Sequence, residues 1–243
     1  MKAIGRFASI RERSQGGFSL LELTIAIAVL AVVVAVIVSG VTQLQKTNTA
    51  QAVNVDLTQE SRQFMDQVVE DLHQAGFPST AMFDPATQLL MAPGGCLPGA
   101  APQPCYAAGL VQVTSSQIQY EGDVDGTGVS EIFVQLSPAG GPCPCKLLRG
   151  AVLKANFLAT GAAPTYYTEV DGVNNLNIFT AYDKFGNVVA LPCGTVTVGV
   201  CADGSSITNI KDMGVLLNVQ SNVPNPITHT YTNVTMSTEA KLQ

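Results

Sequence analysis

Oxygen-bearing side chains recur at close intervals in the segment Glu121–Glu131, in a pattern that could bind a cation. Acids occupy every second position at the start of this segment, and Gly126 follows the last of them. Carboxylate oxygens on alternating residues can converge on Ca²⁺ while a glycine makes the sharp turn, and a threonine carbonyl can complete the set. The sequence therefore predicts a candidate calcium site made of Glu121, Asp123, Asp125, Thr127 and Glu131.

The same segment has a second interpretation as a plain hairpin turn. Asp125-Gly126 is a strong signal for a tight connection between two strands. The acid that ends an EF-hand calcium loop is missing, because Ile132 occupies that place and Glu131 lies one residue early. Calcium binding and a simple turn both stay open at this point.

Six cysteines form a second set of residues that could react or bind a metal, and the segments around them are rich in glycine and proline. Short segments with turn-forming residues favour Cys96–Cys105 and Cys193–Cys201 as disulfides in an oxidising compartment. The remaining two stand in Cys143-Pro144-Cys145, where a bridge between them or separate pairing elsewhere is open. A zinc site is the rival interpretation, but the spacings are not C-x-x-C and only His73 and His229 could assist.

No other constellation indicates catalysis. The two histidines stand in unrelated contexts, and the sequence has no serine-hydrolase, zinc-protease or phosphate-loop motif. We therefore expect a protein that is not an enzyme and that needs no cofactor, calcium excepted. The net charge is −6, and the leader Met1–Gly17 carries +3 of it, from Lys2, Arg6, Arg11 and Arg13 against Glu12. The rest of the chain therefore carries about −9, so we expect no binding to nucleic acid.

The element that precedes these residues is a long apolar segment. From Leu23 to Gln45 there are 23 residues without a charge. As a helix this segment is roughly 35 Å long, which is enough to cross a hydrocarbon core of about 30 Å. Basic residues precede it in Met1–Gly17, so that leader should stay cytoplasmic while the following chain is exported. A secretory signal peptide is the alternative, but its apolar region would be shorter and would end at a small-residue cleavage site.

The start of the apolar segment carries a more specific pattern. Gly17-Phe18-Ser19-Leu20-Leu21-Glu22-Leu23, after a short basic leader, resembles the type IV prepilin signature. The resemblance implies that a membrane peptidase cuts after Gly17 and methylates the new N-terminal amine of Phe18. It also implies an assembly role for Glu22, because a buried cationic amine needs an anion and Glu22 of a neighbouring subunit can supply it.

The helix is expected to continue beyond the membrane. Asn54–Ala75 carries one apolar stripe at helical spacing, and Gly76 and Pro78 should end it. The stretch Gln59–Phe77 resembles the corresponding part of PilW-type minor pilins and of the related pseudopilin J.

Short β-rich segments follow and predict an antiparallel sheet packed on the helix, an α+β fold similar to that of type IV pilins. The expected strands are Leu110–Tyr120, Glu131–Ser137, Lys146–Leu158, Tyr166–Val170, Val173–Tyr182, Val188–Leu191, Thr195–Val200, Ile207–Gln220 and Ile227–Met236. The expected organisation is a cleaved leader (1–17), a transmembrane assembly helix (18–53) and a periplasmic head (54–243).

These resemblances imply a minor pilin that initiates or caps a type IV pilus. Its partners would be other pilin subunits, bound through the N-terminal helix, and the prepilin peptidase. It would lie in the inner membrane with a periplasmic head before it enters an extracellular pilus. A type II secretion pseudopilin, in a periplasmic pseudopilus, is the alternative. A tip adhesin that binds a ligand is the third expectation.

Overall fold

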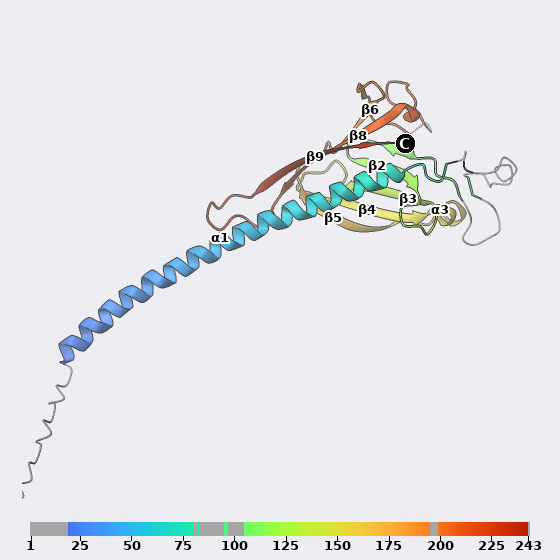
Figure 1. Ribbon diagram of the computed structural model, residues 1–243. Coiled ribbons are helices and arrows are strands. Elements are labelled where there is room, and N and C mark those ends of the chain that lie inside the picture. Colours follow the sequence, from blue (N-terminus) through green and yellow to red (C-terminus); the bar gives the residue numbers. More distant parts are fainter. Residues whose placement is uncertain (1–18, 80–81, 83–94, 97–104, 195–198, 243) are drawn as a thin grey trace, which may run out of the picture. The chain divides into compact units, whose positions relative to one another are not determined.

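The computed structural model describes residues 19–79, 82, 95–96, 105–194 and 199–242 (Figure 1). Its contacts divide the chain into two compact units, Met1–Asn48 and Thr49–Gln243. The first unit contains the start of helix α1, and the second contains the rest of this helix together with the sheet. The predicted leader 1–17 lies outside the described residues.

Helix α1 spans Leu20–Gln74 and begins in the first unit as an apolar helix. Residues 19–46 are all exposed, although most of them are alanine, valine, leucine or isoleucine. Such a surface is unfavourable in water on every side of the helix, so a nonpolar environment must cover it. Length and composition make α1 a candidate membrane span.

The part of α1 in the second unit has one buried face. The predicted apolar stripe is confirmed, because the buried apolar residues recur at helical spacing: Leu57, Phe64, Met65, Val68 and Leu72. The helix ends at Gln74, close to the predicted stop. Gly76 follows with φ of +87°, a conformation that glycine adopts without steric cost.

The described strands of the second unit form one antiparallel sheet in the order β1-β2-β3-β4-β5-β8-β6-β7, with β9 paired to β8. Figure 1 shows the part of α1 in the second unit running along this sheet, which gives the predicted α+β fold of the pilin type. The strands are β1 (Leu110–Val113), β2 (Gln117–Gly122), β3 (Ser130–Ser137), β4 (Cys145–Leu153), β5 (Thr165–Val173), β6 (Phe179–Asp183), β7 (Val188–Val189), β8 (Ile210–Gln220) and β9 (Asn233–Lys241).

Several expected strands have different bounds in the structure. The segment Leu110–Tyr120 is a hairpin rather than one strand, since Thr114 N–H donates to the Gln117 carbonyl at 2.7 Å and closes a turn. The last strand is β9, which begins six residues after the expected start at Ile227. The expected strand Val173–Tyr182 is interrupted before β6. Most of the expected strand Thr195–Val200 lies outside the described residues.

The prediction that Lys146–Leu158 is one strand is wrong at its C-terminal end. Strand β4 ends at Leu153, and helix α3 spans Lys154–Thr160. A short apolar segment fits either a strand or a helix, and periodicity cannot separate the two. Gly161 ends α3 in a left-handed conformation with φ of +64°, as is usual after a helix.

Candidate functional site

The predicted processing residues, Gly17 and Phe18, lie outside the described residues. The described chain starts at Ser19, whose side-chain oxygen accepts a hydrogen bond from Leu21 N–H at 3.3 Å. The Ser19 carbonyl accepts from Leu23 N–H at 3.1 Å, so Ser19 caps the start of α1.

Glu22 lies in the first turn of α1 and is exposed. A carboxylate is favoured at this end of a helix, because the unpaired N–H groups there carry partial positive charge. The two ion pairs in the described part of the chain are Arg149–Asp71 and Lys154–Glu121, so Glu22 has no ion-pair partner among these residues.

The structure divides the residues of the predicted calcium site into two groups. Glu121 of β2 and Glu131 of β3 face each other across the ladder and are only 5% and 3% exposed. Asp123 and Asp125 lie in the turn between these strands and accept hydrogen bonds from it. Gly128 N–H donates to Asp123 at 3.1 Å, and Thr127 donates to Asp125 from its N–H at 2.9 Å and its hydroxyl at 2.6 Å.

This division leaves the calcium prediction without a preformed ligand set. Among the described residues, no three acids, histidines or cysteines are grouped as metal ligands. The cause is local, because Glu121 and Glu131 belong to strands rather than to the loop between them. Calcium binding at this turn therefore stays a prediction from the sequence alone.

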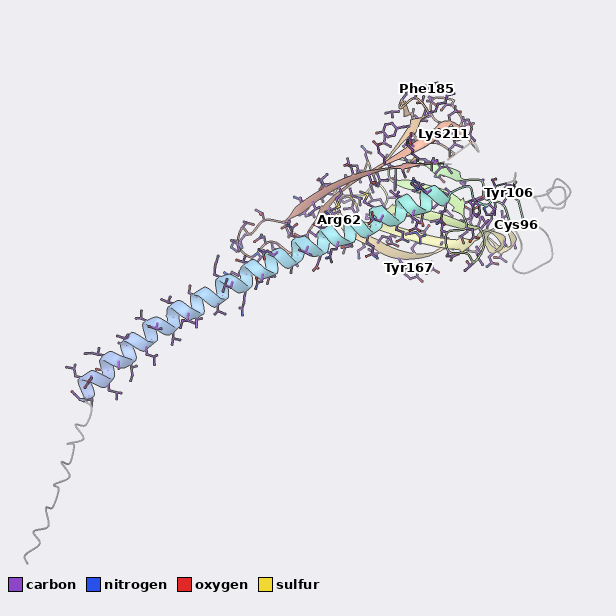
Figure 2. All side chains as sticks on the ribbon, viewed as in Figure 1. Arg62, Cys96, Tyr106, Tyr167, Phe185 and Lys211 are labelled. Carbon is purple, nitrogen blue, oxygen red and sulfur yellow. A yellow bond between two sulfur atoms is a disulfide. The ribbon has the colours of Figure 1, made fainter. Side chains whose placement is uncertain are left out.

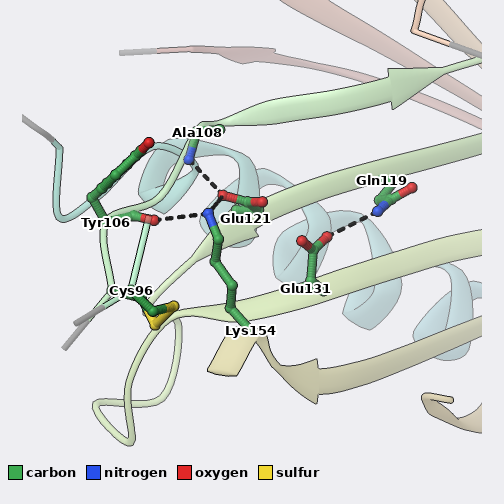
Figure 3. Close-up of polar contacts among 8 residues, drawn as sticks. Cys96, Tyr106, Ala108, Gln119, Glu121, Glu131 and Lys154 are labelled. Carbon is green, nitrogen blue, oxygen red and sulfur yellow. Dashed lines mark hydrogen bonds and ion pairs between the residues drawn. A yellow bond between two sulfur atoms is a disulfide. The ribbon is translucent and has the colours of Figure 1, made fainter. Parts of the chain in front are cut away.

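Glu121 takes part in a different arrangement, centred on Lys154 at the start of α3. Figure 3 shows Lys154 Nζ donating to Glu121 Oε2 at 2.6 Å and to the Tyr106 carbonyl at 3.1 Å. Ala108 N–H donates to the same Glu121 oxygen at 2.7 Å. Gln119, two residues before Glu121 on β2, donates a hydrogen bond from its side chain to Glu131 Oε2 at 2.9 Å. We call Lys154, Glu121 and Glu131 the buried triad.

A small apolar cluster lies beside the buried triad at one end of the sheet. Figure 2 shows Cys96 and Tyr106 close together there, and Tyr106 N–H donates to the Gly95 carbonyl at 2.9 Å. Cys96 packs in a small buried cluster with Cys105, Ala107 and Val129. Lys154 is only 3% exposed, although lysine is rarely buried unless it is paired.

The electrostatics of the buried triad favour a proton on the carboxyl group of Glu131. Burial raises the pKa of Glu131 to about 8, and a hydrogen bond to Glu121 and the charge of Glu121 add to this effect. At neutral pH Glu131 is therefore mainly protonated. Lys154 Nζ forms an ion pair with Glu121 Oε2 in the same buried group.

A second buried polar group joins α1 to the sheet. Tyr120 of β2 donates its hydroxyl to Asp71 Oδ2 at 2.7 Å, and Arg149 of β4 contacts the same oxygen. Burial raises the pKa of Tyr120, and the negative charge of Asp71 adds to that shift. Sequence reasoning missed this group and the role of Lys154. The one available signal was an acid, Asp71, on the apolar side of the helix.

The six cysteines are joined in three disulfides. The structure contains the two pairs that sequence spacing favoured, Cys96–Cys105 and Cys193–Cys201. It joins the remaining two as a bridge within Cys143-Pro144-Cys145, one of the alternatives left open. No cysteine is left free for a zinc site.

Comparison with known proteins gives one family model, the prokaryotic N-terminal methylation motif, which matches residues 13–38. No curated protein and no solved structure matches the chain. The motif is typical of type IV prepilins and pseudopilins, and it implies processing by a prepilin peptidase. The matched residues include the predicted cleavage site, Glu22 and the first part of the apolar helix. The chain thus carries the N-terminal processing and assembly motif of a pilin-like subunit.

Proposed function

We propose that this protein is a minor pilin, a structural subunit that helps initiate or cap a type IV pilus after cleavage behind Gly17. The methylation motif at residues 13–38 carries the proposal, because it lies at the start of an exposed apolar helix. The head provides further support, since its antiparallel sheet packs on the second half of that helix and the head contains three disulfides.

The proposed assembly step uses the first residues of the mature chain. Cleavage leaves a cationic amine on Phe18, which becomes costly when subunits bury it in a filament. Glu22 is exposed and has no ion-pair partner in the described part of the chain, so it is free to accept the amine of a neighbouring subunit. The apolar helices would pack together and so remove their side chains from lipid.

A minor subunit is favoured over a major one by the stretch Gln59–Phe77, which resembles PilW-type minor pilins. A type II secretion pseudopilus is the second candidate, because the same methylation motif precedes subunits of both systems. The two candidates differ in where the mature protein ends up. A minor pilin leaves the cell with the pilus, whereas a pseudopilin stays in the envelope.

Shearing of surface filaments from the native host tests the proposal. We expect the mature chain in the sheared pilus fraction at a small ratio to the major subunit, and we expect its loss in a strain without prepilin peptidase. A mature chain confined to the membrane and periplasm would favour the pseudopilus. An unprocessed chain in cells that contain the peptidase would contradict both candidates.

A further inference from the structure

We propose that Lys154 and Glu121 become joined by an isopeptide bond inside the head, with Glu131 as the acid that assists the reaction. The three side chains come from α3, β2 and β3 and meet in one buried place. The inference does not depend on the role in a pilus, since it rests on the geometry of the buried triad.

The amino group of Lys154 and the carboxyl group of Glu121 are already in contact. Lys154 Nζ lies 2.6 Å from Glu121 Oε2, and the side chains are 4% and 7% exposed. The Tyr106 carbonyl accepts a second hydrogen bond from Nζ at 3.1 Å and fixes its position. Holding two reactants at such a distance replaces a bimolecular encounter and removes a large part of the barrier. Exclusion of water also favours the amide, because water is the product that is released.

Two further groups match the needs of acyl transfer. Ala108 N–H donates to Glu121 Oε2 at 2.7 Å, so it is placed to stabilise negative charge on that oxygen. Glu131 shares a side-chain hydrogen bond with Glu121, and it holds a proton at neutral pH because its pKa is raised to about 8. A buried carboxylic acid with such a pKa is suited to give and take a proton in the reaction.

The chemical step balances without any other reactant. The Lys154 ammonium passes one proton to the Glu121 carboxylate, which gives a neutral amine and a carboxylic acid. The Nζ lone pair then attacks Glu121 Cδ, and negative charge forms on Oε2 beside the Ala108 N–H. Glu131 gives its proton to the hydroxyl oxygen on Cδ, the C–O bond breaks, and water leaves. The remaining extra proton on Nζ returns to Glu131, so one amine and one acid have become one amide and one water.

The bond would tie β2 to the first residue of α3 beside the Cys96–Cys105 disulfide. The two linked residues are 33 positions apart in sequence, so the bond closes a covalent loop that contains all of β3 and β4. Unlike the disulfides, an amide persists under reducing conditions. Denaturation in a thiol reductant therefore separates its contribution from theirs.

Peptide mapping of the full chain tests the proposal. The folded protein is denatured, reduced and digested with chymotrypsin, which can cut after Tyr120 and Phe133. We expect a branched peptide in which residues 121–133 are joined to the fragment carrying Lys154, with the summed mass reduced by one water. Trypsin should fail to cut after Lys154 but should cut after Lys146 in the same sample. A free 121–133 peptide together with complete cleavage after Lys154 would overturn the proposal.

Two variants test the role of the acid. Glu131→Gln keeps the size of the side chain and its hydrogen bonds but removes the proton donor, so we expect the branched peptide to disappear or to form at least tenfold more slowly. Glu239→Gln, on the exposed face of β9, should link as the wild type does. Linking of Glu131→Gln at the wild-type rate would show that Glu131 is not the acid. If that variant does not fold, the wild-type peptide map still decides whether the bond forms.

Discussion

Asp71 and Arg149 are 78 positions apart in the sequence, yet Arg149 donates to Asp71 Oδ2 from Nε at 2.9 Å and from Nη2 at 2.8 Å. Asp71 lies on α1 and Arg149 on β4, so this contact fixes the helix against the sheet. The side chains are 7% and 17% exposed, and Tyr120 shares the same acceptor oxygen. Removal of the acid would leave a partly buried cation and a buried hydroxyl without their partner.

The first prediction concerns this contact. Asp71→Ala should lower the free energy of unfolding by about 3–5 kcal/mol, as is usual when one partner of a buried ion pair is removed. Glu70→Ala changes the adjacent acid, which is exposed, and should have an effect below about 0.5 kcal/mol. Urea denaturation of the detergent-solubilised chain, followed by circular dichroism, gives both values. Equal midpoints for the two variants would contradict the role assigned to Asp71.

The second prediction concerns processing. Mass spectrometry of the mature N-terminus should find a chain that begins with N-methylated Phe18. Gly17→Ala should leave most of the protein uncut, because the peptidase must approach this backbone closely and a side chain obstructs it. A mature chain that starts at any other residue would show that the cleavage site is misassigned.

The third prediction concerns the acid at the start of α1. Glu22→Ala should leave membrane insertion and cleavage intact, since an apolar residue enters lipid more easily than an acid. Entry into sheared pili should fall at least tenfold, because the amine of the neighbouring subunit loses its partner. Asp56→Ala, an exposed acid further along the same helix, is the matched control. Quantitative immunoblots of sheared filaments measure both, and wild-type incorporation of Glu22→Ala would refute the pairing.

The fourth prediction concerns pH. Burial raises the pKa of Glu131 to about 8, whereas the unfolded chain releases this proton in the usual carboxyl range. The folded state therefore binds more protons between these limits, so the contribution of Glu131 to stability falls as the pH rises towards about 8. Melting temperatures of the wild type should drop between pH 6 and pH 8 relative to those of Glu131→Gln. A difference that does not change over this interval would mean that Glu131 is ionised throughout.

The fifth prediction concerns calcium at the turn. A divalent ion would bind Asp123 and Asp125, because Glu121 is held by Lys154 and Glu131 is buried beside it. With so few donors we expect weak binding and a small rise in melting temperature in millimolar calcium relative to chelator. Asp123→Ala/Asp125→Ala should abolish the rise. Identical melting of the wild type in calcium and in chelator leaves Asp125-Gly126 as a plain hairpin turn.

Features that depend on residues close together in the sequence could be predicted without the structure. The pattern from Gly17 to Glu22 and the uncharged segment that follows are continuous, so no tertiary information is needed to recognise them. The apolar stripe of α1 repeats at the period of the helix, and it predicts the buried face without knowledge of the sheet. The partners in Cys96–Cys105 and in Cys193–Cys201 are only nine and eight positions apart in the sequence, so their pairing depends on short segments of the chain.

The polar residues that meet inside the head could not be predicted in this way, because they come from distant parts of the sequence. Lys154 was expected in a strand, and Glu121 and Glu131 were expected in a calcium site, yet the three form one buried group. Their meeting depends on the register of β2 against β3 and on the change from β4 to α3 at Lys154. A shift of one residue in either strand would turn these side chains to the opposite face. Sequence spacing does not encode that register, because the packing of the whole sheet on α1 selects it.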